Sequence, residues 1–130
     1  LDARNRAEAQ RCQTAIRTAA AAGSILFQRA SAELDQRSLP TIQALAKAAN
    51  ECPAMRIEIE GHTDAEGTAE RNKGLSERRA QSVLARLKAA GVGDGRMQAF
   101  GFGAEKPVAP NDTPDNRARN RRIEFNVRAQ

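Results

Sequence analysis

The sequence predicts an α+β fold: a β-α-β-α-β-β mixed four-stranded sheet with helices packed on one face, plus an extra N-terminal helix. Short segments that alternate apolar and polar residues indicate strands, and segments with apolar residues at helical spacing lie between them. Two helical crossovers followed by a long return loop imply a mixed sheet covered by helices. The 130 residues are enough for one domain that buries the larger part of its apolar surface.

The first helix is expected over residues 2–22, which are rich in Ala, Arg and Gln. Its apolar face is formed by Cys12, Ile16, Ala19 and Gly23, and Gly23 with Ser24 ends it. We expect residues 1–23 to pack as a helix on a domain formed by residues 24–130. A short apolar strand over 24–27 opens that domain, and a second helix begins at Ser38 and Pro40 and stops at Cys52-Pro53. The buried positions of this helix are expected at Leu39, Ile42, Leu45 and Ala49.

The central strand is expected over 55–60, where Ile57 and Ile59 alternate with Glu58 and Glu60. It breaks at Gly61, and a polar turn follows. Thr68 can cap the next helix, which ends at Gly91. The apolar stripe of this helix comprises Leu75, Ala80, Val83, Leu84 and Leu87.

The third strand is expected over 96–103, with a glycine-weakened end. The loop after it contains Pro107, Pro110 and Pro114, which predicts irregular structure. A last strand alternates Ile123, Phe125 and Val127 with polar residues.

Composition excludes a membrane-spanning segment, because no apolar run approaches the roughly 20 residues needed. The chain starts at Leu1 with neither Met nor a signal peptide, so we expect a piece of a longer protein whose targeting segment lies outside it. The formal net charge of +5 and the pI near 10 favour a polyanionic neighbour without identifying it.

Two cysteines, Cys12 and Cys52, have a spacing that fits no metal motif. A disulfide between them would tie the N-terminal helix to the start of the central strand and indicate an oxidising compartment. Two reduced core cysteines remain an equal alternative on composition alone.

Three other groups of polar residues suggest different functions. His62 with Asp64 and Glu66 could form a metal cluster, but no second His supports it. Ser76 near His62 could indicate a hydrolase, but no nucleophile elbow surrounds it, which favours a helix-surface serine. The arginines of the segment 117–122 could bind phosphates, yet the chain has no Trp or Tyr to stack on bases, so we expect them to pair with nearby glutamates and one to line a site.

A set of spaced motifs resembles the OmpA-like, or OmpA/MotB C-terminal, peptidoglycan-binding domain. These motifs are Gly61-His-Thr-Asp64, Asn72, Leu75-Ser76, Arg79-Ala80, Gly101-Phe-Gly103, Pro107, Asn111 and Asn120-Arg-Arg122, and the similarity covers residues 25–128. The resemblance implies the same β-α-β-α-β-β fold. It also implies noncovalent binding of peptidoglycan through the diaminopimelate of its stem peptide.

The resemblance implies that Asp64 and Arg79 hold the amino acid and that Asn72, Leu75 and Arg121 belong to the same site. Diaminopimelate carries an ammonium and a carboxylate on one carbon, and a carboxylate beside a guanidinium suits that pair of charges. Without the family context, Asp64 and Arg79 would be read as an ordinary internal salt bridge. Gln28, Ala30 and Glu66 depart from the residues usual in the family, so contacts from the first strand are in doubt and stem-peptide preference is expected to differ.

The sequence thus predicts a non-enzymatic module that anchors an envelope protein to the cell wall, with no catalytic residue, metal or cofactor. The expected location is the periplasm, in association with the outer membrane of a Gram-negative bacterium. The expected partner is peptidoglycan rather than nucleic acid, with membrane contact only through a missing N-terminal region and a monomeric or weakly dimeric state. The alternative function is a basic nucleic-acid-binding domain.

Overall fold

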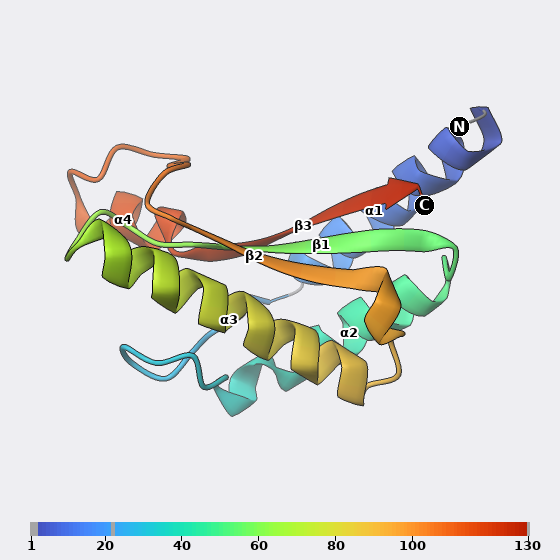
Figure 1. Cartoon of the computed structure of the whole chain (residues 1–130), viewed down its shortest axis with the longest axis horizontal. Helices are drawn as coiled ribbons and strands as arrows, with labels where there is room; N and C mark the ends of the chain where they lie inside the picture. The colour runs from blue at the N-terminus through green and yellow to red at the C-terminus, as the bar shows by residue number, and fades with distance from the viewer. Residues whose placement is uncertain (1–2, 22, 130) are drawn as a thin grey trace.

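A computed structural model describes residues 3–21 and 23–129 of the chain. Its helices are α1 (Ala3–Ala21), α2 (Leu39–Asn50), α3 (Ala69–Ala89) and α4 (Pro114–Asn120), and its strands are β1 (Met55–His62), β2 (Met97–Gly103) and β3 (Arg122–Ala129). Short 3-10 turns, η1 (Gln36–Ser38) and η2 (Asp94–Arg96), precede α2 and β2. The α+β class and the order of α1, α2, β1, α3, β2 and β3 agree with the sequence-based prediction (Figure 1).

The sheet in the described part of the chain has three strands in the order β2-β1-β3, with β1 parallel to β2 and antiparallel to β3. The strand predicted over 24–27 does not join it. Phe27 forms one isolated bridge with Leu34, and the Asp35 N–H donates to the Leu26 carbonyl. The chain turns back on itself here, so the backbone groups of this segment bond to one another instead of to the sheet.

β1 runs two residues further than predicted. Gly61 pairs with Gly101 on one side and with Ile123 on the other, and the register against β2 shifts only between Gly61 and His62. The glycine therefore does not end the strand. Only glycine fits here because α3 passes close over the strand: a Cβ at Gly61 would lie 2.1 Å from the Ser76 carbonyl oxygen.

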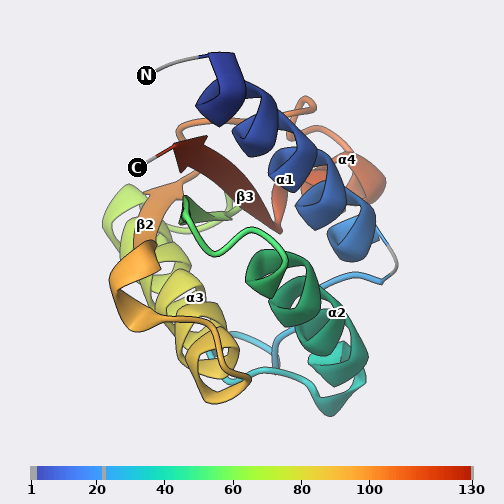
Figure 2. The ribbon, with the colours of Figure 1, turned by 90° about the vertical axis from the view of Figure 1, so that its right-hand side faces the viewer.

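The core lies on one face of the sheet. Alternation along the strands turns Ile57, Ile59 and Phe125 toward α1, α2 and α3, which all contribute buried residues to the same cluster. Figure 2 shows α2 between α1 and α3, with α1 beside β3. None of the described helices is long and apolar enough to cross a membrane.

α4 was not predicted, because prolines at positions 107, 110 and 114 indicated irregular structure. Pro114 occupies the first turn of the helix, where its missing N–H costs nothing. The Thr113 hydroxyl accepts from the Asn116 N–H and caps the helix. A Thr-Pro pair ahead of polar helix formers was the sequence signal for this element.

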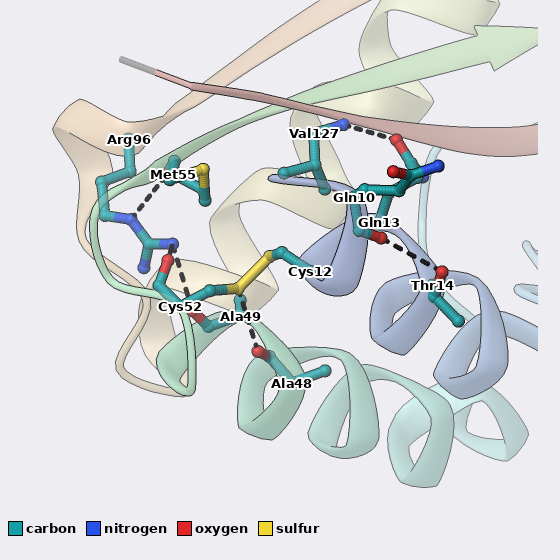
Figure 3. The surroundings of a disulfide bond; sticks show 10 residues. All are labelled: Gln10, Cys12, Gln13, Thr14, Ala48, Ala49, Cys52, Met55, Arg96 and Val127. Atoms are coloured by element: carbon teal, nitrogen blue, oxygen red, sulfur yellow. Dashed lines mark hydrogen bonds between the residues drawn. A yellow bond between two sulfur atoms is a disulfide. The ribbon is translucent and has the colours of Figure 1, made fainter. Parts of the chain in front are cut away.

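Cys12 and Cys52 form a disulfide with their Cα atoms 6.1 Å apart. This bond joins α1 to the segment between α2 and β1, as the sequence prediction of a bridge required (Figure 3). Arg96 closes the same corner: its guanidinium donates to the carbonyls of Ala49, Cys52 and Met55. Ala49 lies in the last turn of α2, Cys52 just beyond it and Met55 at the start of β1, so Arg96 links the end of the helix to the central strand.

Candidate functional site

The candidate site lies where the C-terminal end of β1, the turn before α3 and the junction between α4 and β3 meet. In Figure 1 these segments converge at the left-hand end of the sheet. The Thr68 hydroxyl accepts from the Arg71 N–H and fixes the start of α3, as the sequence predicted. The strand, the capped helix and the last strand therefore fix the short segments that carry Asp64 and Arg121.

Asp64 lies just beyond the end of β1 and is only 6% exposed. One carboxylate oxygen, Oδ1, accepts from the Glu66 N–H at 3.0 Å, which closes a local turn. The other, Oδ2, accepts from Arg121 Nη1 at 2.6 Å. Both oxygens of this buried carboxylate are thus hydrogen-bonded, as a buried charge requires.

Arg79 does not pair with Asp64, so the internal salt bridge that these two residues suggest without the family context is not formed. Its Nε donates to the Ser31 carbonyl at 2.8 Å, and its guanidinium lies 4.8 Å above the centre of the Phe27 ring. Within the described ranges, the two terminal nitrogens of Arg79 have no hydrogen-bond or ion-pair partner.

The charges of Asp64 and Arg121 both act on Arg79. Burial lowers the pKa of Arg79, the positive charge of Arg121 lowers it further, and the Asp64 carboxylate acts in the opposite direction. One carboxylate therefore stands beside two guanidiniums. The cluster carries an excess of positive charge that an anion could neutralise.

Asn72 supports the turn that carries Asp64. Its Nδ2 donates to the carbonyl of Glu66 at 2.9 Å and to that of Asp64 at 3.3 Å. Leu75 lies one helical turn further along α3 and is half-buried. The structure places both residues near this end of α3, and it gives Asn72 a positioning contact.

Several contacts around the site were not found by sequence reasoning. Ser31 supplies the carbonyl that orients Arg79, and Glu66 forms an ion pair with Arg117 at 3.3 Å. The Asn111 side chain accepts from the Ala65 N–H and from the Asn120 amide. No local pattern marks a backbone carbonyl or an ion pair between residues so far apart in sequence.

Asn120 fixes the segment from which Arg121 projects. It is fully buried, its Oδ1 accepts from the N–H groups of Val108 and Ala109, and its Nδ2 donates to the Ala109 carbonyl and to Asn111. These bonds use both the oxygen and the nitrogen of the Asn120 side-chain amide. They tie the loop before α4 to the end of that helix.

The arginines of segment 117–122 are largely paired, as expected. Arg117 pairs with Glu66, Arg121 with Asp64 and Arg122 with Glu124. Of the four, Arg119 is the one without a carboxylate partner in the part of the chain that the structure describes.

Ser76 is not the helix-surface serine that the sequence suggested. It is fully buried between α3 and β2, where its hydroxyl donates to the Lys73 carbonyl and accepts from the Gly103 N–H. Its oxygen is committed to joining the helix to the strand.

His62 does not gather with Asp64 and Glu66, the set that the sequence left as a weak metal candidate. Across residues 3–21 and 23–129, the group of side chains placed to hold a metal ion is Glu60, His62 and Glu124. Burial lowers the pKa of His62, followed by the charge of Arg122, while Glu124 and Glu60 act against the shift.

The chain is similar to known proteins of one family. The OmpA family matches residues 26–121. Outer membrane porin F of Pseudomonas aeruginosa is 39% identical over 82% of this chain, and the peptidoglycan-binding protein ArfA of Mycobacterium tuberculosis is 36% identical over 88% of it. The chain spans 31% and 35% of the length of these two relatives.

Among solved structures, the peptidoglycan-associated lipoprotein of Burkholderia pseudomallei superimposes with a TM-score of 0.71 at 33% identity. The superposition covers 81% of this chain and 87% of that one. The fold, the order of the motifs and the matched residues agree, and the chain belongs to the OmpA family.

Proposed function

We propose that the chain is a non-enzymatic module that binds peptidoglycan noncovalently through the diaminopimelate of its stem peptide. In this role it anchors an envelope protein to the cell wall, on the periplasmic side of an outer membrane. The names of its relatives, a peptidoglycan-binding protein, a peptidoglycan-associated lipoprotein and an outer membrane porin, support the ligand and the location.

The observation that carries the proposal is the free end of Arg79. Its guanidinium is half-buried and held at Nε by Ser31, yet its terminal nitrogens have no partner among the described residues. A partly desolvated cation without a counterion is costly, and a ligand carboxylate gripped by both terminal nitrogens removes that cost.

Asp64 supplies the complementary charge for the ligand ammonium. In the absence of ligand, Arg121 holds its Oδ2 at 2.6 Å. Arg121 is 47% exposed in its side chain, so it can turn toward solvent or toward the ligand carboxylate when an ammonium arrives. On binding, the ion pair between Asp64 and Arg121 is replaced by two: Asp64 with the ligand ammonium and an arginine with the ligand carboxylate. This exchange favours a zwitterion over a simple anion.

The proposal is tested by calorimetric titration with diaminopimelate and with a stem tripeptide that contains it. We expect Arg79→Ala and Asp64→Ala to weaken binding by at least about thirtyfold, because loss of one partner from a buried charge pair costs roughly 2 kcal/mol or more. Arg79→Lys should weaken it too, since an ammonium cannot grip a carboxylate in two places.

The matched control is Arg78→Ala, which removes a neighbouring arginine that is exposed on the same helix. It should bind as the wild type does, and circular dichroism should show all variants folded. Unchanged binding in both Asp64→Ala and Arg79→Ala would overturn the assignment. A steep fall of DNA or RNA affinity with salt would instead favour nucleic acid as the ligand.

A further inference from the structure

The face of the sheet turned away from the helices carries a cluster of Glu60, His62 and Glu124. Glu60 on β1 lies directly opposite Glu124 on β3, and His62 follows two residues later on the same side of β1. One ligand atom from each of the three lies within 4.8 Å of the others. The antiparallel register, and not nearness in sequence, brings these groups together.

The arrangement is unfavourable as it stands. Like charges directly opposite on neighbouring strands repel each other. Arg122 bonds to Oε2 of Glu124 and Asn126 bonds to Oε2 of Glu60, which offsets part of that repulsion. The second oxygen of Glu124 has no hydrogen-bond partner within the described residues, and that of Glu60 has only His62.

His62 is poorly satisfied for so buried a ring. Its side chain is 1% exposed, its Nδ1 has no hydrogen-bond partner among the described residues, and its Nε2 lies 3.4 Å from Oε1 of Glu60. That distance exceeds the normal length of an N–H···O hydrogen bond. Nε2, the ring nitrogen that faces Glu60, therefore has only a weak partner, which a metal ion held between the imidazole and the carboxylates would replace.

We propose that Glu60, His62 and Glu124 form a binding site for a divalent transition metal ion of the Zn²⁺ class. An imidazole nitrogen with two carboxylate oxygens is a ligand set that zinc accepts, whereas calcium and magnesium favour oxygen ligands throughout. The Glu124 side chain is 43% exposed, so the site opens to solvent and leaves a coordination position for water or a ligand.

Arg122 sets the strength of this site. Its guanidinium places a positive charge against Glu124 and competes with the metal ion for that carboxylate. It also donates to the carbonyls of Asn120 and Lys106, and these acceptors can keep it in place when Glu124 turns to the ion. The site is therefore of moderate affinity, and removing the arginine charge should strengthen it.

The test is calorimetric titration of tag-free, oxidised protein with ZnCl₂. Both cysteines are in the disulfide and cannot serve as ligands. We expect one zinc ion per chain, with affinity reduced at least about tenfold in Glu60→Gln and in Glu124→Gln, comparable with the smallest losses seen for outer-shell partners. Arg122→Gln should raise the affinity.

The matched control is Glu58→Gln, which removes a carboxylate from the same strand and face that pairs with Arg128. It should leave zinc binding unchanged, as should Arg79→Ala, which separates this site from the peptidoglycan site. NMR of the His62 ring should report zinc binding directly. If variants of the buried His62 do not fold, Glu124→Gln still tests the site, because Glu124 is partly exposed. Absence of zinc binding, wild-type zinc affinity in both Glu60→Gln and Glu124→Gln, or displacement of the bound zinc by excess Ca²⁺ would overturn the proposal.

Discussion

Gly61 and Gly101 show how single residues set the distance between helix and sheet. They stand opposite each other on β1 and β2, beneath α3. A Cβ at Gly61 would lie 2.1 Å from the Ser76 carbonyl oxygen, and one at Gly101 would lie 2.4 Å from the Glu77 nitrogen. Both clashes involve helix backbone, so no side chain can turn away to relieve them.

We therefore expect Gly61→Ala to destabilise the protein by about 3 kcal/mol or more, at or above the upper end of the usual cost of overpacking. Urea unfolding followed by circular dichroism measures this change. Gly95→Ala is the control, because a Cβ there would meet nothing within 4 Å. Equal stability of the two variants would show that α3 is free to move away from the sheet.

Asp35 provides a prediction for pH dependence. The Arg37 side chain and then the Arg37 backbone N–H hydrogen-bond to its carboxylate and lower its pKa from 3.8 to about 2. A carboxyl whose pKa is depressed by folding adds stability above its unfolded value of 3.8, and this contribution is lost as the pH falls through about 2.

An NMR titration of the Asp35 carboxyl checks that shift. The midpoint should lie near pH 2 in the wild type and move toward 3.8 in Arg37→Gln, which removes the side-chain bond and leaves the backbone one. A midpoint that is the same in both proteins would contradict the assigned cause.

At the scale of elements, α1 shields the outer edge of β3. Gln13 on α1 donates to the Phe125 carbonyl and accepts from the Val127 N–H, so one side-chain amide covers the open edge of β3. Exposed strand edges invite pairing with other chains. The disulfide holds the helix that carries this cover, in the corner that Figure 3 shows.

Loss of the disulfide should lower stability by about 3–4 kcal/mol, the chain-entropy value for a loop of this length. Cys12→Ala/Cys52→Ala compared with the oxidised wild type in urea gives the measurement without burying new hydroxyls. Wild type treated with reductant should behave like the double variant. If neither loses stability, core packing such as that of Ile16, and not the disulfide, holds α1 in place.

At the scale of the whole molecule, every residue of the candidate site lies outside α1. The family match begins at residue 26, after this helix. The helix nevertheless contributes Cys12 and Ile16 to the common core. A division into residues 1–23 and 24–130 thus predicts that removing the first part lowers stability without weakening ligand binding.

A fragment of residues 24–130 that carries Cys52→Ala should bind the diaminopimelate ligand within about threefold of the full chain. It should also lose more than the roughly 3 kcal/mol attributed to the disulfide, because Ile16 leaves the core as well. Titration and urea unfolding of the same sample test both parts. A folded fragment that no longer binds would show that α1 takes part in the site.

Local patterns in the sequence predict the α+β class and the positions of α1, α2, α3 and the three strands of the sheet. The residues of the proposed peptidoglycan site come from the spaced motifs and stay a prediction. Alternation in β1 and β3, the Thr68 cap and the spaced motifs are local signals, readable without knowledge of neighbours. The Thr-Pro start of α4 was also present but was outweighed by the prolines before it. The strand expected at residues 24–27 failed because its backbone groups found partners within its own loop.

Tertiary packing, by contrast, sets which charged side chains meet. Asp64 pairs with Arg121, 57 residues away, and leaves Arg79 to Ser31 and Phe27. Glu60 faces Glu124 because the register of two antiparallel strands puts them there. Side-chain partners across a sheet follow from register and packing, which no local pattern encodes, so the sequence named the site residues while the fold assigned their partners.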